Sequence, residues 1–265
     1  MNHLRMYRPF AIAAVGILLV ALLPGSALAA TIYVGPGGGA GGCLEPTYTT
    51  IGDAVTAAGS TDTIHVCAGN YTGLVTITGK DLTFVGDGVN STIISGESSN
   101  GLFATDSAIT VTDMTLQDGA ATAAISVSGS AAVVAMRVVF TTNQGGAIAA
   151  PTSPVSVNDS TFDSNLATNG AAIAAATLTV SNSTFVNNVA SVSGGAIFAA
   201  NATILNSTFS GNSATSGAVI RASGAVTISN SILAGTGTTN CAGGGAFTDG
   251  EGNLSTDISC GFFSG

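Results

Sequence analysis

The 265-residue chain contains little charge, few aromatic residues and no tryptophan. Only 7% of its residues are charged, 6% are aromatic, and five Lys and Arg stand against fourteen Asp and Glu. Nucleic acids and anionic membrane surfaces select for clustered basic residues, so this balance argues against both as partners. A chain of low charge can be disordered, but here Val, Ile, Leu and Phe recur too regularly for disorder.

Long apolar runs are missing except at the amino terminus. Arg5 and Arg8 precede an apolar stretch at residues 10 to 23, and Ala27-Leu28-Ala29 follows as a small-x-small pattern. About fourteen apolar residues are few against the roughly twenty that span a bilayer, so we predict a cleaved signal peptide at 1–29. The mature chain then carries three basic and fourteen acidic residues, a net charge of about −11. We expect it to be secreted or at the cell surface, without membrane insertion.

Cysteine is scarce, and no CxxC pair is present among the four cysteines. In an exported chain, four cysteines indicate two disulfides, for which three connectivities exist. Sequence proximity favours Cys43–Cys67 and Cys241–Cys260. A metal site is the alternative, but His65 is the only histidine outside the signal peptide, so we predict no metal.

Glycine, with 36 residues, and a regular apolar repeat dominate what remains. The repeat is marked by large apolar residues that follow one another at intervals of 22 to 24 positions: Leu116, Phe140, Phe162, Phe185, Phe209 and Leu233. Apolar residues two positions apart precede each of these landmarks, which indicates short strands and leaves no room for a long helix. The sequence therefore predicts an all-β fold, a right-handed parallel β-helix of about seven coils of about 24 residues each.

Stacked coils convert each aligned position into a column along the helix axis. Two asparagine columns are predicted to be structural ladders, because Asn tolerates left-handed backbone and its amide can bond to the next coil. One column lies three residues after the landmarks and contains Asn143, Asn165, Asn188 and Asn212. The other lies at the preceding turn and contains Asn182, Asn206 and Asn230, with Asp159 in the same column. Ser160, Ser183, Ser207 and Ser231 are predicted to point inward.

Two short motifs alternate along these repeats. FxxN occurs at 140–143, 162–165, 185–188 and 209–212, and GGAI occurs at 145–148 and 194–197. This alternation, over residues 140 to 221, resembles the repeats of polymorphic outer membrane proteins, a family of surface-displayed β-helical adhesins. The resemblance implies a surface-displayed binding protein.

The two ends of the chain have different patterns. Residues 33–36, 48–58, 62–66 and 69–71 resemble the opening of pectin-lyase-like β-helix proteins. Within them, Thr50 and Asp53 form a pair like a capping box, and Ile51, Val55 and Ala58 share one face of a short helix that would cover the end of the coil stack. We expect an N-terminal cap at 30–67, coils at 68–233 and a disulfide-closed C-terminal cap at 234–265.

Enzymes that use this fold include pectin and pectate lyases, which need a basic residue and a Ca²⁺ site made of carboxylates. The one column with both signs of charge contains Asp113, Arg137 and Asp159. We expect Arg137 to be clamped between the two carboxylates, and a guanidinium is a poor base. We therefore predict no catalysis and no cofactor. A polysaccharide lyase or related enzyme acting on acidic polysaccharide, with Ca²⁺ at these residues, is the alternative.

The predicted function is a β-helical scaffold, adhesin-like, that binds a glycan or a surface protein through polar, uncharged side chains. One outward column, Thr110, Thr179, Thr203 and Thr227, resembles the threonine columns of ice-binding β-helices. Paired Thr-x-Thr at the same place on successive coils is missing, which argues against ice as the ligand.

Overall fold

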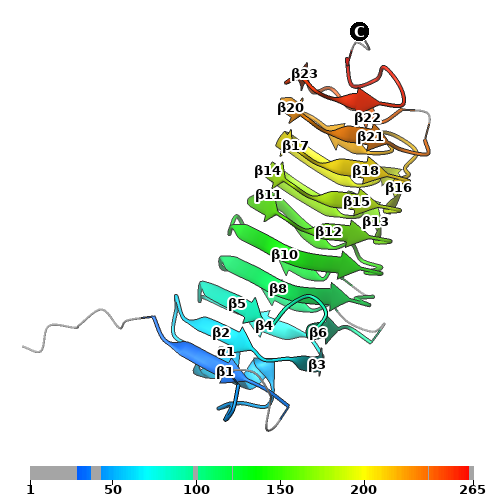
Figure 1. The fold of residues 1–265 in the computed structure, drawn as a ribbon. Helices are drawn as coiled ribbons and strands as arrows, with labels where there is room; N and C mark the ends of the chain where they lie inside the picture. Colours follow the sequence, from blue (N-terminus) through cyan, green and yellow to red (C-terminus); the bar gives the residue numbers. More distant parts are fainter. Residues whose placement is uncertain (1–28, 37–42, 98–100, 121, 238, 263–265) are drawn as a thin grey trace, which may run out of the picture.

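The computed structural model describes residues 29–36, 43–97, 101–120, 122–237 and 239–262. The predicted signal peptide therefore lies outside the described residues, apart from its last position. Within the described ranges the chain winds into a right-handed parallel β-helix, drawn in Figure 1 with its coils stacked one on another. The predicted fold class is confirmed.

Three parallel ladders of strands run along the stack. Five long strands turn a corner and serve two ladders each: β8 (Ile109–Gln117), β10 (Val133–Thr141), β11 (Ile148–Asn158), β14 (Ile173–Ser181) and β17 (Ile197–Leu205). The first ladder joins β1 (Thr31–Val34), β2 (Thr63–Val66), β5 (Leu82–Gly86), β20 (Val226–Ser229) and β23 (Phe247–Asp249) with one part of each long strand.

The second ladder uses the later parts of β8 and β10. Its other strands are β3 (Gly69–Thr72), β6 (Thr92–Ser95), β12 (Thr161–Asp163), β15 (Thr184–Val186), β18 (Thr208–Ser210), β21 (Ile232–Ala234) and β24 (Leu254–Ser255). The third ladder joins the early parts of β11, β14 and β17 with β4 (Val75–Ile77), β7 (Phe103–Thr105), β9 (Ile125–Val127), β19 (Ile220–Ala222) and β22 (Cys241–Ala242). A separate short pair is formed by β13 (Leu166–Asn169) and β16 (Val189–Ser193).

The stack has about eight coils, one more than the sequence predicts. The difference arises at the amino-terminal end, where β2 lies inside the predicted cap but already pairs with β5 in the first ladder. Equivalent positions there are unevenly spaced, since Thr63 pairs with Thr83 and Thr83 pairs with Thr110. An uneven interval hides a coil from a search for a fixed repeat.

A short helix, α1 (Ile51–Ala57), covers the amino-terminal end of the stack (Figure 1). Thr50 is its N-cap: the Thr50 hydroxyl accepts a hydrogen bond from the Asp53 amide at 3.1 Å and donates one to the Asp53 carboxylate at 2.7 Å. Within the helix, the side chains of Ile51 and Val55 are buried. This is the predicted capping helix, and it shields strand edges that would otherwise invite pairing with another chain.

The centre of the core is the column of large apolar residues that mark the repeat. Phe140, Phe162, Phe185 and Phe209 are fully buried and stack face to face, with ring centroids 4.7, 4.7 and 4.5 Å apart. Because parallel strands in register lie about 4.8 Å apart, identical rings in one column stack without adjustment. Each of these four coils therefore contributes one ring to the stack, and the rings of Phe162 and Phe185 each stack on both neighbours.

The buried asparagine column is a continuous chain of amides. Asn143, Asn165, Asn188 and Asn212 have no exposed surface, and the Nδ2 of each of the first three donates to the Oδ1 of the next at 2.9 Å. Each side chain also bonds to backbone groups of adjacent coils, as where Asn188 Nδ2 donates to the Phe162 carbonyl at 3.0 Å. Four buried amides are tolerated here because the side-chain nitrogen and oxygen of each have a hydrogen-bond partner.

The turn column has a different construction. Asn182, Asn206 and Asn230 adopt left-handed backbone with φ near +50°, as do Asp113, Arg137 and Asp159 in the same column. Asn206 Nδ2 donates to Asn182 Oδ1 at 3.2 Å on the surface. Just after this turn the predicted inward serines are buried, and the Ser183 hydroxyl accepts the Ser160 amide at 3.2 Å.

Two disulfides close the ends of the stack in the pairing that sequence proximity favours. Cys43 is joined to Cys67, and Cys241 is joined to Cys260. Among the described residues no cysteine is free. Each bridge ties a terminal segment to a coil at one end of the molecule.

Candidate functional site

One outward column of the first ladder is composed almost entirely of threonine. Its members, paired in register from one end of the molecule to the other, are Thr31, Thr63, Thr83, Thr110, Val134, Ser156, Thr179, Thr203, Thr227 and Thr248. We call this surface the threonine face. All ten side chains are at least partly exposed. The four outward threonines predicted from the sequence belong to it, and the structure adds members at both ends.

The hydroxyls of the threonine face are not used to hold the protein together. Within the described part of the chain, none of the nine Thr and Ser hydroxyls in this column has a hydrogen-bond partner. The buried serines and asparagines, by contrast, are fully paired. The face therefore offers donors and acceptors at a regular rise of about 4.8 Å along the axis.

A shallow groove lies on this face over β14, β17 and β20. Its walls are formed by two adjacent outward columns, Thr177 with Asn201 and Ala225, and Thr179 with Thr203 and Thr227. The Asn201 side chain already makes one hydrogen bond within the protein, because its Oδ1 accepts the Ala225 amide at 2.9 Å. The threonines remain free to bond to a ligand.

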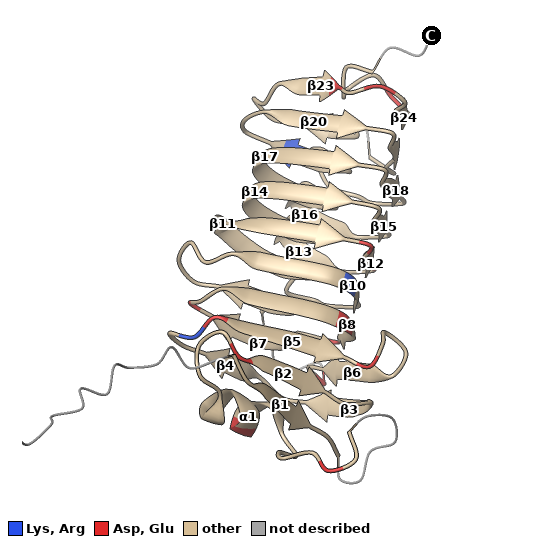
Figure 2. Ribbon diagram, turned by 60° about the vertical axis from the view of Figure 1, so that its left-hand side comes forward, with Lys and Arg blue, Asp and Glu red and all other residues tan. Residues whose placement is uncertain are grey.

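Charge is nearly absent from the long strand faces. In Figure 2 the coloured Lys, Arg, Asp and Glu segments lie mainly at turns, at the corners of the coils and at the two ends, while the broad faces of the strands are tan. An uncharged face with free hydroxyls is suited to a ligand recognised by hydrogen bonds.

A second hollow on the third ladder is lined by Thr76, Ser126 and Asp106, among others. The Asp106 carboxylate is hydrogen-bonded within the protein. Its Oδ1 accepts the Gly79 amide at 2.8 Å and the Ser107 hydroxyl at 2.7 Å. These bonds, from Ser107 first and then Gly79, lower the pKa of Asp106. The carboxylate therefore serves the local turn.

The mixed-charge column contains one ion pair and not the predicted clamp. Arg137 donates from Nε and Nη2 to the two oxygens of Asp113 at 2.6 and 2.7 Å. Asp159, one coil further, accepts instead from Asn158 Nδ2 at 2.6 Å. Only the Asp113 carboxylate is hydrogen-bonded to the guanidinium, and Asp159 acts on Arg137 through its charge alone.

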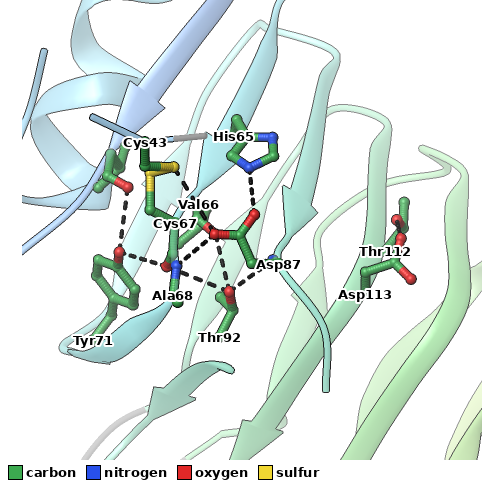
Figure 3. Close-up of polar contacts among 11 residues, drawn as sticks. Cys43, His65, Val66, Cys67, Ala68, Tyr71, Asp87, Thr92, Thr112 and Asp113 are labelled. Atoms are coloured by element: carbon green, nitrogen blue, oxygen red, sulfur yellow. Dashed lines mark hydrogen bonds and ion pairs between the residues drawn. A yellow bond between two sulfur atoms is a disulfide. The ribbon is translucent and has the colours of Figure 1, made fainter. Parts of the chain in front are cut away.

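Electrostatics in this pair favour both charged forms. The hydrogen bond from Arg137 lowers the pKa of Asp113, and the hydrogen bond to Asp113 raises the pKa of Arg137. Asp113 also accepts from the Thr112 hydroxyl at 2.6 Å (Figure 3). A guanidinium held in this way stays protonated and is unsuited to abstract a proton.

A cluster near the amino-terminal disulfide is not evident in the sequence. His65 Nε2 lies 2.7 Å from Asp87 Oδ1, and Asp87 Oδ2 accepts the Ala68 amide at 2.8 Å (Figure 3). Cys43 Sγ is 3.9 Å from Asp87 Oδ2, although a disulfide sulfur has no proton to donate. His65 and Asp87 lie on consecutive coils, and since neither belongs to a repeated motif, no sequence signal joins them.

The repeated part of the chain matches a known family. Residues 75–233 match the family described as the right handed beta helix region, and the chain belongs to it. No curated protein is significantly similar in sequence.

Solved structures with a similar course of the chain include pectin methylesterases. One, in complex with hexasaccharide VII, is 13% identical, with 80% of each chain covered and a TM-score of 0.49. Another, from carrot, is 16% identical, with 85% of this chain and 82% of that chain covered and a TM-score of 0.47. These proteins are enzymes, which contradicts the prediction that this chain is not an enzyme, and that prediction is withdrawn. At such identities and TM-scores the likeness does not transfer an activity.

Two observations bear on location. The disulfides are compatible with an oxidising, extracellular compartment. In the described part of the chain, no helix has both the length and the apolar character needed to cross a membrane.

Proposed function

We propose that this protein is exported and binds an extended, uncharged carbohydrate along the threonine face. The observation that carries the proposal is the column of nine unpaired hydroxyls, in runs of four and five successive coils that are separated by Val134. A polysaccharide is itself a regular array of hydroxyls, so a regular column of donors and acceptors can bond to several sugar units at once. The FxxN and GGAI repeats, which resemble those of surface-displayed adhesins, support display at the cell surface.

Charge guides the choice of ligand. The mature chain carries about eleven net negative charges, which disfavours polyanions such as polyuronates and nucleic acids. Neutral glycans escape this repulsion. The groove over β14, β17 and β20 is the place where two polar columns face the same ligand, and it is the expected centre of the contact.

A glycan array with the purified exported protein, followed by sedimentation with insoluble neutral polysaccharides, tests the proposal. Thr203→Glu places a charge in the groove, and we expect it to weaken binding at least about tenfold, because a carboxylate buried against sugar is left unpaired. Thr208→Glu is the matched control, since Thr208 is equally exposed but lies on the second ladder. Equal binding by the two variants, or no binding to any glycan, contradicts the proposal.

A second candidate is a carbohydrate-active enzyme, favoured by Asp113, Arg137 and Asp159 lying on three consecutive coils. In this candidate Asp113, held ionised by Arg137, is the reacting carboxylate, and Arg137 positions it. Pectin, polygalacturonate and alginate, with and without Ca²⁺, are the substrates to test, with unsaturated products and released methanol as readouts. Turnover that is lost in Asp113→Asn but retained in Thr203→Glu would establish this function in place of simple binding.

A further inference from the structure

Cys43, His65 and Asp87 bring three potential metal-ligand atoms together at the amino-terminal end of the first ladder. One sulfur, one imidazole nitrogen and one carboxylate oxygen all lie within 4.8 Å of one another. Cys43 is buried, and His65 and Asp87 are partly exposed, with 25% and 20% of their side-chain surface accessible. The sequence allows either a disulfide or a metal site at the cysteines. In the structure, the Cys43–Cys67 disulfide lies beside two further potential metal ligands, His65 and Asp87.

We infer that opening the Cys43–Cys67 disulfide converts this cluster into a zinc site. Thiolate, imidazole and carboxylate are the ligands that Zn²⁺ takes in proteins, whereas a disulfide sulfur is a poor ligand. Tetrahedral zinc holds its ligand atoms roughly 3.3 to 3.8 Å apart, given bond lengths of about 2.0 to 2.3 Å. The cluster needs only a small contraction around the ion, with the His65 and Asp87 atoms separating slightly from 2.7 Å.

The chemistry is a two-electron reduction followed by metal binding. A dithiol reductant gives two electrons and two protons to the sulfurs of Cys43 and Cys67 and becomes a disulfide itself. Zn²⁺ then displaces the thiol proton of Cys43. His65 binds the ion through Nε2 as the tautomer that carries its ring proton on Nδ1. Water completes the fourth position.

The frame around the site does not depend on the disulfide. The Tyr71 hydroxyl donates to the Cys67 carbonyl at 2.8 Å, and the Thr92 hydroxyl donates to the Val66 carbonyl at 3.0 Å and accepts the Asp87 amide at 2.9 Å. Figure 3 shows these bonds surrounding the cluster. Burial, and then the charge of Asp87, raise the pKa of Tyr71 to about 12, so its hydroxyl keeps the proton that it donates.

The segment that carries Cys43 is also held independently. The Gly35 amide donates to the Tyr48 carbonyl at 3.0 Å, and the Tyr48 amide donates to the Tyr33 carbonyl at 3.2 Å. Cys43 is five residues from this anchor, a short tether that limits how far its sulfur can move from His65 when the bridge opens.

Substitution of one cysteine at a time separates the site from the bridge. Cys67→Ser leaves Cys43 as a permanent thiol, and we expect this variant to bind Co²⁺ without reductant, with the intense thiolate-to-cobalt absorption, and to exchange it for Zn²⁺. Cys43→Ser breaks the same bridge but removes the ligand, and we expect that absorption to be lost. His65→Ala in the Cys67→Ser background should bind Zn²⁺ at least about tenfold more weakly, as expected when a ligand is lost.

The second disulfide supplies the internal control. A Cys241→Ser/Cys260→Ser variant, reduced with a dithiol, should bind the same single equivalent of Co²⁺ as the reduced wild type, and the oxidised wild type should show no thiolate-to-cobalt absorption. Far-ultraviolet circular dichroism of every variant verifies that the β-helix is retained. Failure of folded Cys67→Ser to bind Co²⁺ or Zn²⁺, or equal binding by folded Cys43→Ser, would overturn the inference. The readout is independent of any carbohydrate.

Discussion

At the scale of the residue, side chains in this protein act as members of columns. Phe185 contacts the rings of Phe162 and Phe209, and Asn188 bonds to Asn165 and Asn212. A substitution therefore affects two neighbouring coils as well as its own. Its cost depends on whether the column is buried, as here, or exposed, as on the threonine face.

Phe185→Ala should destabilise the fold by about 3 to 5 kcal/mol, because it removes a fully buried ring from the middle of the stack and leaves a cavity. Urea denaturation followed by circular dichroism measures the change. Thr184→Ala, on the outward side of the same strand, should change stability by no more than about 0.5 kcal/mol. A loss below about 1 kcal/mol for Phe185→Ala would be inconsistent with a close-packed ring stack.

Asp113→Asn should reduce stability at neutral pH and lose its effect in acid. Since the hydrogen bond from Arg137 lowers the folded-state pKa of Asp113 below 3.8, the carboxylate stabilises the fold above about pH 3.8. That contribution disappears as the pH falls through the folded-state pKa. Melting temperatures of wild type and variant should differ at pH 7 and converge at low pH. A difference that grows in acid would refute the assigned pKa direction.

At the scale of the element, the corners of the coils depend on residues whose role is not visible in a single repeat. Asn188 lies just after β15 and satisfies backbone and side-chain groups of both adjacent coils. Short strands of three residues, such as β15 and β18, keep their register through these corner ladders as well as through their own hydrogen bonds.

Asn188→Ala should cost about 3 kcal/mol or more, because it leaves several buried groups unpaired at about 1 to 3 kcal/mol each. Asn206→Ala is the control: its amide is exposed, and only the left-handed backbone and one surface hydrogen bond are affected, a loss of about 1 kcal/mol. Chemical denaturation of the two variants gives the comparison. Similar losses would mean that the buried ladder contributes no more than the surface one.

The sequence predicts elements well where the repeat is regular and poorly where it is not. The Phe and Asn columns are recognisable because identical residues recur at nearly constant intervals. The early members of the threonine face are hidden by the uneven spacing of Thr63, Thr83 and Thr110. Spacing alone also places Asp113, Arg137 and Asp159 in one column but cannot show which neighbour each side chain engages. His65 and Asp87 meet through coil stacking, which no local motif records.

At the scale of the whole molecule, stability is a sum of contacts between successive coils. The helix α1 and the Cys43–Cys67 bridge protect one end, and the Cys241–Cys260 bridge ties down the other. Between them the strands of the second ladder are in register in the middle coils: Phe162 pairs with Phe185, and Asp163 pairs with Val186.

Deletion of residues 163–185 should therefore give a folded protein, because it joins Phe162 to Val186 without changing the register of later coils. Small-angle scattering should show a rod shorter by about 4.8 Å, and circular dichroism should retain its β spectrum. Deletion of residues 163–186 is the control, since it shortens the turn and displaces Asn188 from its buried ladder. If both deletions unfold the chain, the middle coils are not interchangeable.

The register of Phe162 with Phe185 has a consequence for how such a protein changes over time. A duplication or loss of one repeat in the gene alters the reach of the rod by one rung and leaves both sealed ends intact. Each added rung that carries Thr or Ser also extends the row of free hydroxyls. If the threonine face binds a long polymer as proposed, avidity grows with the number of such rungs while the contact at each rung stays the same. The length of the rod can therefore change only in steps of one coil, each about 4.8 Å along the axis.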